Sequence, residues 1–123
     1  MNSIQNPVSV PRFLGEDTPA RVFQKRCQEW APLPALRHKK NGLWQTITWQ
    51  QYYENVQAIA LSLLNLGLHN GDVVCVLAEN RPEWLYVEMA SQCLGMVGNG
   101  IYPTSSPKQL QHILIDSGTR VLF

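Results

Sequence analysis

The stretch "GDVVCVLAENRPEWLYVEMASQCLGMVGNGI" (residues 71–101) decides the fold. It contains the uninterrupted apolar run VVCVLA (73–78), which is typical of a strand covered on both faces. Residues 82–95 follow with a helical pattern and a proline near the first turn, and residues 97–101 form a second short strand. This order predicts two parallel strands joined by a crossover helix.

The same order continues downstream. Ser106 and Pro107 combine a capping hydroxyl with a proline at the first helical position. The helix predicted over 107–117 has one apolar face, formed by Leu110, Ile113 and Leu114. A third strand is predicted over 119–123, which completes a βαβαβ unit of an α/β fold.

Upstream of this unit, the sequence predicts two helices and a hairpin. Thr18 and Pro19 open the first helix, which ends before Pro32. Residues 35–48 predict a β-hairpin around Asn41-Gly42, a pair suited to a turn with positive φ.

The clearest helix is predicted over residues 48–66, because Thr48 and Gln51 have the spacing of a capping box. Its apolar stripe consists of Tyr52, Tyr53, Val56, Ile59, Ala60, Leu63 and Leu64. Residues 1–17 contain prolines and no periodicity, which predicts an extended arm.

Composition limits the function classes. The chain has 123 residues, a net charge of +1 and 45% hydrophobic residues, which is ordinary for a globular domain and gives no electrostatic support for a nucleic-acid partner. Cys27, Cys75 and Cys93 form no CxxC pair, and the histidines lack metal-ligand spacing, so we predict no metal site. No signal peptide is recognisable and the uncharged run 89–107 contains too many polar residues to span a membrane, so we expect a cytoplasmic protein.

Two loops are the site candidates that the predicted sheet suggests, since ligands bind beyond the carboxyl ends of parallel strands. They are residues 79–81 (Glu-Asn-Arg) and residues 102–105 (Tyr-Pro-Thr-Ser). Simple turn chemistry is the alternative interpretation, with Asn80 capping one helix and Ser106 capping the next. The sequence contains neither a P-loop nor a G-x-G-x-x-G fingerprint after a strand, and it offers no catalytic residue.

Residues 71–123 resemble the early part of AMP-forming acyl-CoA synthetases, which belong to the adenylate-forming superfamily. The segments ENRPEW (79–84), YPTSSPKQL (102–110) and ILIDSGTRVLF (113–123) are most similar to the long-chain fatty acid members. The upstream segment 33–68 is similar to the hairpin and helix that precede this region there, so the resemblance covers residues 18–123.

The resemblance implies a reaction in two halves, in which a carboxylate and ATP give acyl-AMP and the thiol of coenzyme A then displaces AMP. Magnesium neutralises the phosphates of such reactions. The ATP contacts of the family lie downstream of the position that matches Phe123. We therefore expect residues 18–123 to be the N-terminal part of an AMP-binding domain, truncated at Phe123, within a longer fatty acyl-CoA synthetase. The 123-residue chain should itself be inactive.

One contact of the family falls inside the chain. The loop that aligns with Tyr102, Pro103 and Thr104 lies beside the coenzyme A path in related synthetases, so the resemblance implies that these three residues bind coenzyme A. Some relatives have glycines at the positions of Pro103 and Thr104.

Two alternatives stay open. The parent could be a related adenylating enzyme with a carrier-protein acceptor, or the chain could be a non-catalytic stand-alone α/β binding module. We also expect self-association through an exposed sheet edge, because unpaired apolar strands pair readily with other chains. Peripheral membrane association of the parent is open as well.

Overall fold

The central strand of the molecule is β3 (Val73–Leu77), which is paired on both sides. In the computed structural model, which describes residues 18–123, β3 lies between β4 (Val97–Ile101) and β5 (Thr119–Leu122). Both pairings are parallel, so the predicted βαβαβ unit is confirmed. The arm predicted for residues 1–17 lies outside the described residues.

The remaining elements also follow the predicted order. The hairpin consists of β1 (Pro34–Lys40) and β2 (Leu43–Thr48), which pair antiparallel. Its turn residues Asn41 and Gly42 both have positive φ, as the pair predicts. The helices are α1 (Pro19–Glu29), α2 (Trp49–Asn65), α3 (Pro82–Cys93) and α4 (Pro107–Asp116).

Polar caps begin three of the four helices at the expected residues. The Thr18 hydroxyl accepts a hydrogen bond from the Arg21 amide, and Thr48 and Ser106 each form a complete capping box. Helix α3 differs, because its N-cap is Arg81, whose side chain makes no capping bond. The interpretation of Asn80 as a cap is therefore wrong: the helix begins one residue too late for the Asn80 amide to cap it.

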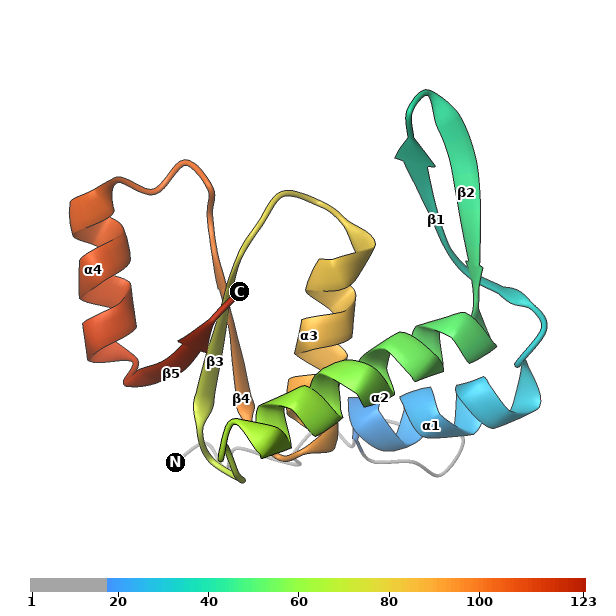
Figure 1. Ribbon diagram of the computed structural model, residues 1–123, viewed down its shortest axis with the longest axis horizontal. Coiled ribbons are helices and arrows are strands. Elements are labelled where there is room, and N and C mark those ends of the chain that lie inside the picture. The colour runs from blue at the N-terminus through green and yellow to red at the C-terminus, as the bar shows by residue number, and fades with distance from the viewer. Residues whose placement is uncertain (1–17) are drawn as a thin grey trace, which may run out of the picture.

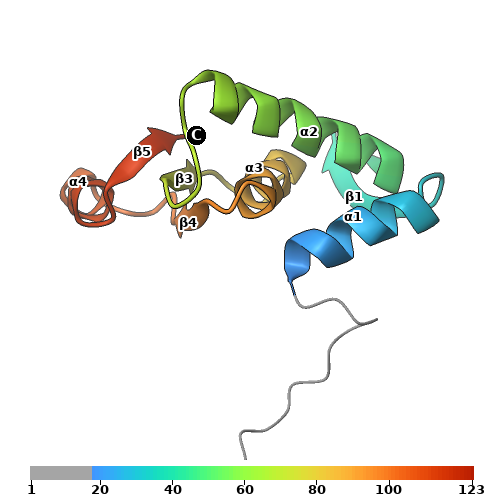
Figure 2. The same cartoon turned by 90° about the horizontal axis from the view of Figure 1, so that it is seen from below.

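The sheet separates two unequal layers. Helices α1, α2 and α3 pack against one another, and α4 lies on the opposite side of the molecule next to β5 (Figure 1, Figure 2). On β3, Val74 and Cys75 are 0% exposed and Val76 is 3% exposed, which confirms that both faces of this strand are covered. The main core consists of Phe23, Cys27, Tyr52, Val56, Leu63, Leu68, Val74, Val76, Tyr86, Val87, Ala90 and Met96.

The buried stripes of α2 and α4 are narrower than the apolar patterns predict. On α2, Tyr53 and Leu64 are exposed, because each lies one residue beyond a buried neighbour and so sits at the margin of the core. On α4 no residue is fully buried, and its apolar face is only half covered by the sheet. No helix within residues 18–123 has the length and apolar content needed to cross a bilayer.

Candidate functional site

The candidate site is a groove at the carboxyl ends of β3 and β4. The two strands pair from Val73 opposite Val97 to Leu77 opposite Ile101, so the chain leaves both strands at the same edge of the sheet. The groove that opens there has a volume of about 490 Å³. Its lining residues are Ala78, Glu79, Asn80, Trp84, Gly100, Ile101, Tyr102 and Pro103.

The floor of the groove depends on a contact between Trp84 and Gly100. A Cβ atom added at Gly100 would lie 2.7 Å from Cζ2 of Trp84, closer than real Cβ contacts come. The indole ring of α3 therefore lies directly against the backbone of β4. Only glycine at position 100 lets the ring take this position without displacement.

The second loop presents an aromatic ring to solvent. Tyr102 is 81% exposed, and its carbonyl accepts a hydrogen bond from the Ser105 amide at 3.0 Å, which closes a turn. Tyr102 and Pro103 line the groove, whereas the exposed Thr104 lies in the same turn outside the lining. The structure thus brings two of the three predicted residues together with Glu79 and Asn80.

Arg81 does not join this groove, because it is paired with Glu83. The Nε and Nη2 atoms of Arg81 donate to the two carboxylate oxygens of Glu83 at 2.9 and 3.0 Å. These hydrogen bonds lower the pKa of the Glu83 carboxyl and raise the pKa of Arg81. The pair is exposed, so we expect little contribution to stability from it.

The charge of the groove limits what it can hold. Among residues 18–123, Glu79 is the one acidic residue that lines it, and no lysine or arginine does so. A phosphate would meet a carboxylate there without a compensating cation. The apolar walls formed by Trp84, Ile101 and Pro103, with the Asn80 amide and the Tyr102 hydroxyl beside them, suit a slender neutral chain with a few polar groups.

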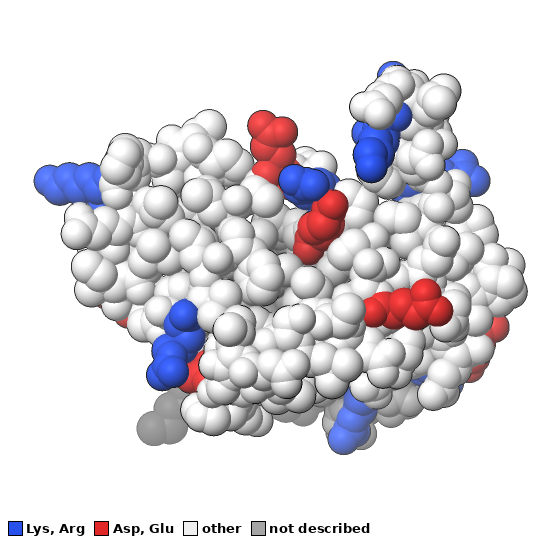
Figure 3. Space-filling view, in the orientation of Figure 1, with Lys and Arg blue, Asp and Glu red and all other residues white. Residues whose placement is uncertain are grey.

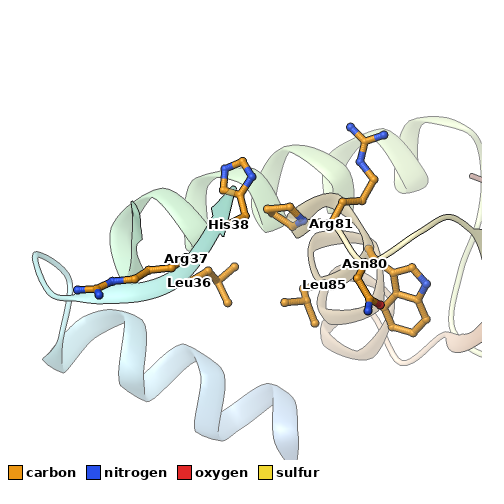
Figure 4. Close-up of a pocket in the computed structure, with 8 residues that line it drawn as sticks. Leu36, Arg37, His38, Asn80, Arg81 and Leu85 are labelled. Carbon is orange, nitrogen blue, oxygen red and sulfur yellow. The ribbon is translucent and has the colours of Figure 1, made fainter. Parts of the chain in front are cut away.

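A second cavity, which the sequence did not reveal, lies between the hairpin and α3. It has a volume of about 300 Å³ and shares Asn80 and Trp84 with the groove, so the start of α3 separates the two spaces. Figure 4 shows Leu36 and Leu85 turned toward each other across it, while the guanidinium groups of Arg37 and Arg81 point away. No local pattern could have indicated this cavity, because it depends on where the hairpin packs.

Two buried groups of the core, the Tyr52 hydroxyl and the Cys27 thiol, are held in their neutral forms. Burial raises the pKa of the Tyr52 hydroxyl to about 12 and that of the Cys27 thiol to about 11. The Tyr52 hydroxyl donates a hydrogen bond to the Leu85 carbonyl at 3.4 Å. These groups serve the core rather than chemistry, since a reactive thiol needs a lowered pKa. Within residues 18–123 no group of three or more His, Cys, Asp and Glu side chains is placed to hold a metal ion.

The Trp84–Gly100 contact gives a direct test of the groove. We expect Gly100→Ala to lower the free energy of unfolding by about 1–3 kcal/mol, because the new methyl group overlaps the indole ring. Urea unfolding measures the change. Gly100 does not have a positive φ, so the cost comes from the ring alone.

The control is the double variant Gly100→Ala with Trp84→Phe, compared with Trp84→Phe alone. The smaller ring leaves room for the methyl group, so in this background the Gly100→Ala cost should shrink to less than about 0.5 kcal/mol. An equal cost in both backgrounds would mean that Trp84 does not lie against Gly100.

Comparison with known proteins adds the family. The family described as AMP-binding enzyme matches residues 23–123. The long-chain-fatty-acid–CoA ligase heimdall of Drosophila melanogaster is 32% identical over 115 residues, which are 90% of this chain and 17% of that protein. The long-chain-fatty-acid–CoA ligase ACSBG1 of Homo sapiens is 33% identical over 103 residues, which are 84% of this chain and 14% of that protein.

Solved structures agree with the fold. The N-terminal subdomain of Klebsiella oxytoca NpsA, in complex with 3-hydroxybenzoyl-AMSN, is 25% identical with a TM-score of 0.76, covering 85% of this chain and 25% of that one. The fatty acid AMP ligase from Legionella pneumophila has a TM-score of 0.80 at 22% identity, covering 89% of this chain and 20% of that one. The chain spans less than a fifth of the length of the curated relatives it matches. With a family match over nearly all of its described residues, the chain belongs to the AMP-binding enzyme family.

Proposed function

We propose that the chain is the N-terminal part of a long-chain fatty acyl-CoA ligase, and that its groove contributes to the path of coenzyme A. The groove between the β3 and β4 loops is the observation that carries the proposal, because it lies at the ligand-binding edge of the sheet. The identity of 32–33% to proteins named long-chain-fatty-acid–CoA ligases supports the substrate class.

The proposed ligand portion is the pantetheine arm of coenzyme A rather than its nucleotide. This arm is neutral, slender and rich in amides, which fits a groove with apolar walls, an asparagine and a tyrosine hydroxyl. Glu79 disfavours the phosphates of the nucleotide in the same space. Bound coenzyme A would supply the thiol that takes the acyl group from AMP, while Trp84 and Tyr102 hold its arm in position.

Adenylate formation needs groups that this segment does not contain. Transfer of an adenylyl group requires fixed positive charge and backbone donors around the phosphates. No lysine or arginine of the described part of the chain lines the groove, and the sequence has no glycine-rich loop with a lysine. ATP and Mg²⁺ would therefore be held by other parts of a longer enzyme, and residues 1–123 alone would not activate a fatty acid.

A carrier-protein acceptor is the second candidate. It is favoured by the similarity to NpsA, which is also described in an artificial fusion of an adenylation domain with a PCP domain, at 25% identity and a TM-score of 0.73. A carrier protein presents the same neutral pantetheine portion, attached through a phosphate, so the groove fits the arm of either acceptor. The two differ in whether free coenzyme A is a substrate.

A chimera tests the proposal. Residues 18–123 replace the matching segment of human ACSBG1, and acyl-CoA formation is measured with a long-chain fatty acid, ATP and coenzyme A. We expect activity to be retained.

Tyr102→Ala should raise the KM for coenzyme A about fivefold to tenfold, because it removes one hydrogen-bonding side chain from the groove proposed for the pantetheine arm. The KM for ATP should stay unchanged. Tyr53→Ala, an exposed tyrosine on α2, is the matched control.

Titration of the 123-residue chain covers the case of a chimera that does not fold. Coenzyme A and pantetheine should both shift the indole N–H resonance of Trp84, whereas ATP should not, and the chain with ATP and a fatty acid should release no pyrophosphate above background. A chimera that folds and forms acyl-AMP without using free coenzyme A would favour the carrier-protein acceptor. A folded chain whose Trp84 resonance ignores pantetheine would contradict the proposed role of the groove.

We also propose that the isolated chain associates with itself through its sheet edges. The order β4-β3-β5 leaves one edge of β4 and one edge of β5 unpaired within the described chain. Val97, Leu122 and Phe123 on or beside these strands are 52%, 42% and 41% exposed. Open edges with exposed apolar side chains favour pairing between chains.

Sedimentation at several protein concentrations measures this association. We expect the mean mass to rise with concentration, and Leu122→Lys to shift the rise to higher concentration because a charge on an edge strand opposes pairing. Ile115→Lys is the control, since Ile115 is 72% exposed and belongs to helix α4 rather than to an edge strand. A monomer at every concentration would rule out the association.

A further inference from the structure

The tip of the hairpin carries large apolar side chains in the open. Leu43 and Trp44 are 67% and 70% exposed, at the start of β2. Figure 1 shows the hairpin projecting from the rest of the described chain, with its turn at the far end. We propose that this tip binds the surface of an anionic lipid membrane by shallow insertion. The proposal does not depend on the coenzyme A groove.

The strand register places apolar and basic side chains together on both faces of the tip. Lys40 pairs with Leu43, and Lys39 pairs with Trp44. Directly opposite residues share a face and successive residues alternate, so each face carries one lysine and one apolar side chain. A flat protein surface would cover only one of these faces. A lipid headgroup layer surrounds the tip and covers both.

Charge complementarity favours an anionic surface. Residues 34–48 include Arg37, Lys39 and Lys40 but no Asp or Glu, so the hairpin holds three of the ten Lys and Arg residues. The rest of the sequence has seven Lys and Arg against nine Asp and Glu. Figure 3 shows blue side chains on the hairpin, whereas the central part of this face carries both signs. An anionic membrane would attract the hairpin and repel the remainder, which orients the tip toward the lipid.

The polarity of the turn sets the depth of insertion. Asn41 and Gly42 occupy the tip itself, so it would stop among the headgroups rather than in the hydrocarbon core. Tryptophan prefers this interfacial level, and lysine side chains extend to reach phosphates while their stems lie along apolar groups. The polar turn, followed by the lysine and tryptophan side chains, therefore suits the polar environment of a lipid headgroup layer.

Another exposed apolar residue provides the contrast. Ile115 on α4 is 72% exposed, nearly as much as Trp44, but its next neighbour in sequence is Asp116 rather than a basic residue. Exposure alone would make both residues equal in membrane binding. The proposal requires them to differ.

Vesicle sedimentation is the test, with phosphatidylcholine vesicles that contain either no phosphatidylserine or about 30 mol% of it. The 123-residue chain should bind the anionic vesicles and bind the neutral ones at least tenfold more weakly. Lys39→Ala and Lys40→Ala should each weaken binding about fivefold. Trp44→Ser should weaken it by a similar factor or more, whereas Ile115→Ser should change it less than twofold. All variants keep β4 and β5 intact, so any self-association is common to the series.

Quenching by brominated lipids separates insertion from surface adsorption. The tryptophan fluorescence of the bound chain should be quenched, and Trp44→Phe should remove most of this quenching because the other three tryptophans lie at residues 30, 49 and 84, outside the tip. Circular dichroism checks that these surface variants remain folded.

Three outcomes of the vesicle experiments would overturn the proposal. They are equal binding to both kinds of vesicle, equal loss from Ile115→Ser and Trp44→Ser, and quenching that persists in Trp44→Phe. Binding to a soluble polyanion as tight as binding to the vesicles, without quenching by lipid, would show simple anion adsorption and would also overturn it.

Discussion

The parallel pairing of β3 with β4 is the interaction on which the rest of the structure depends. Its last rung joins Leu77 to Ile101, so both loops leave the sheet at one edge. Helix α3, which connects the two strands, lays the Trp84 ring against Gly100 of β4. Strand order, helix position and groove are thus consequences of one register, and a slip by one residue would place a side chain where the indole ring lies.

The second pairing, of β3 with β5, completes the cover of the central strand. The Cys75 Sγ and Thr119 Oγ1 atoms lie 2.9 Å apart, and the Phe123 amide donates to the Cys75 carbonyl at 2.9 Å. With Cys75 fully buried, β3 is the best protected segment of the sheet, while β4 and β5 each have one edge that no strand of residues 18–123 pairs with. The molecule therefore combines a closed centre with exposed apolar groups at its margins, and these margins are where we expect interactions with other molecules.

Local signals in the sequence predicted the elements, and packing decided what they could not. The apolar run 73–78, the three polar caps and the Asn41-Gly42 turn are each encoded within a few residues, and all appear as expected. The prediction of Asn80 as an N-cap is wrong because the sequence alone does not show whether helix α3 begins after Asn80 or one residue later, after Arg81. The cavity between Leu36 and Leu85 joins residues 49 positions apart, and no local pattern reports such a distance.

The candidate site was predictable to the same extent. The rule for parallel sheets identified the loops 79–81 and 102–105, and the structure joins Glu79 and Asn80 to Tyr102 and Pro103 in one groove. The rule could not assign Trp84 to the floor of the groove. The position of the Trp84 ring depends on the absence of a side chain at Gly100, which lies in a different element. The rule also could not show that Arg81 turns to Glu83, so that no lysine or arginine of residues 18–123 lines the groove.

The most direct measurement of the central claim is a nuclear Overhauser experiment on the Trp84–Gly100 contact. The register of β3 and β4 predicts a strong effect between the Trp84 Hζ2 proton and the Gly100 Hα protons, and an upfield shift of those Hα protons from the ring current. The same effect to Asn99 or Ile101 in place of Gly100, or no effect to β4 at all in the folded chain, would contradict the register and the groove built on it.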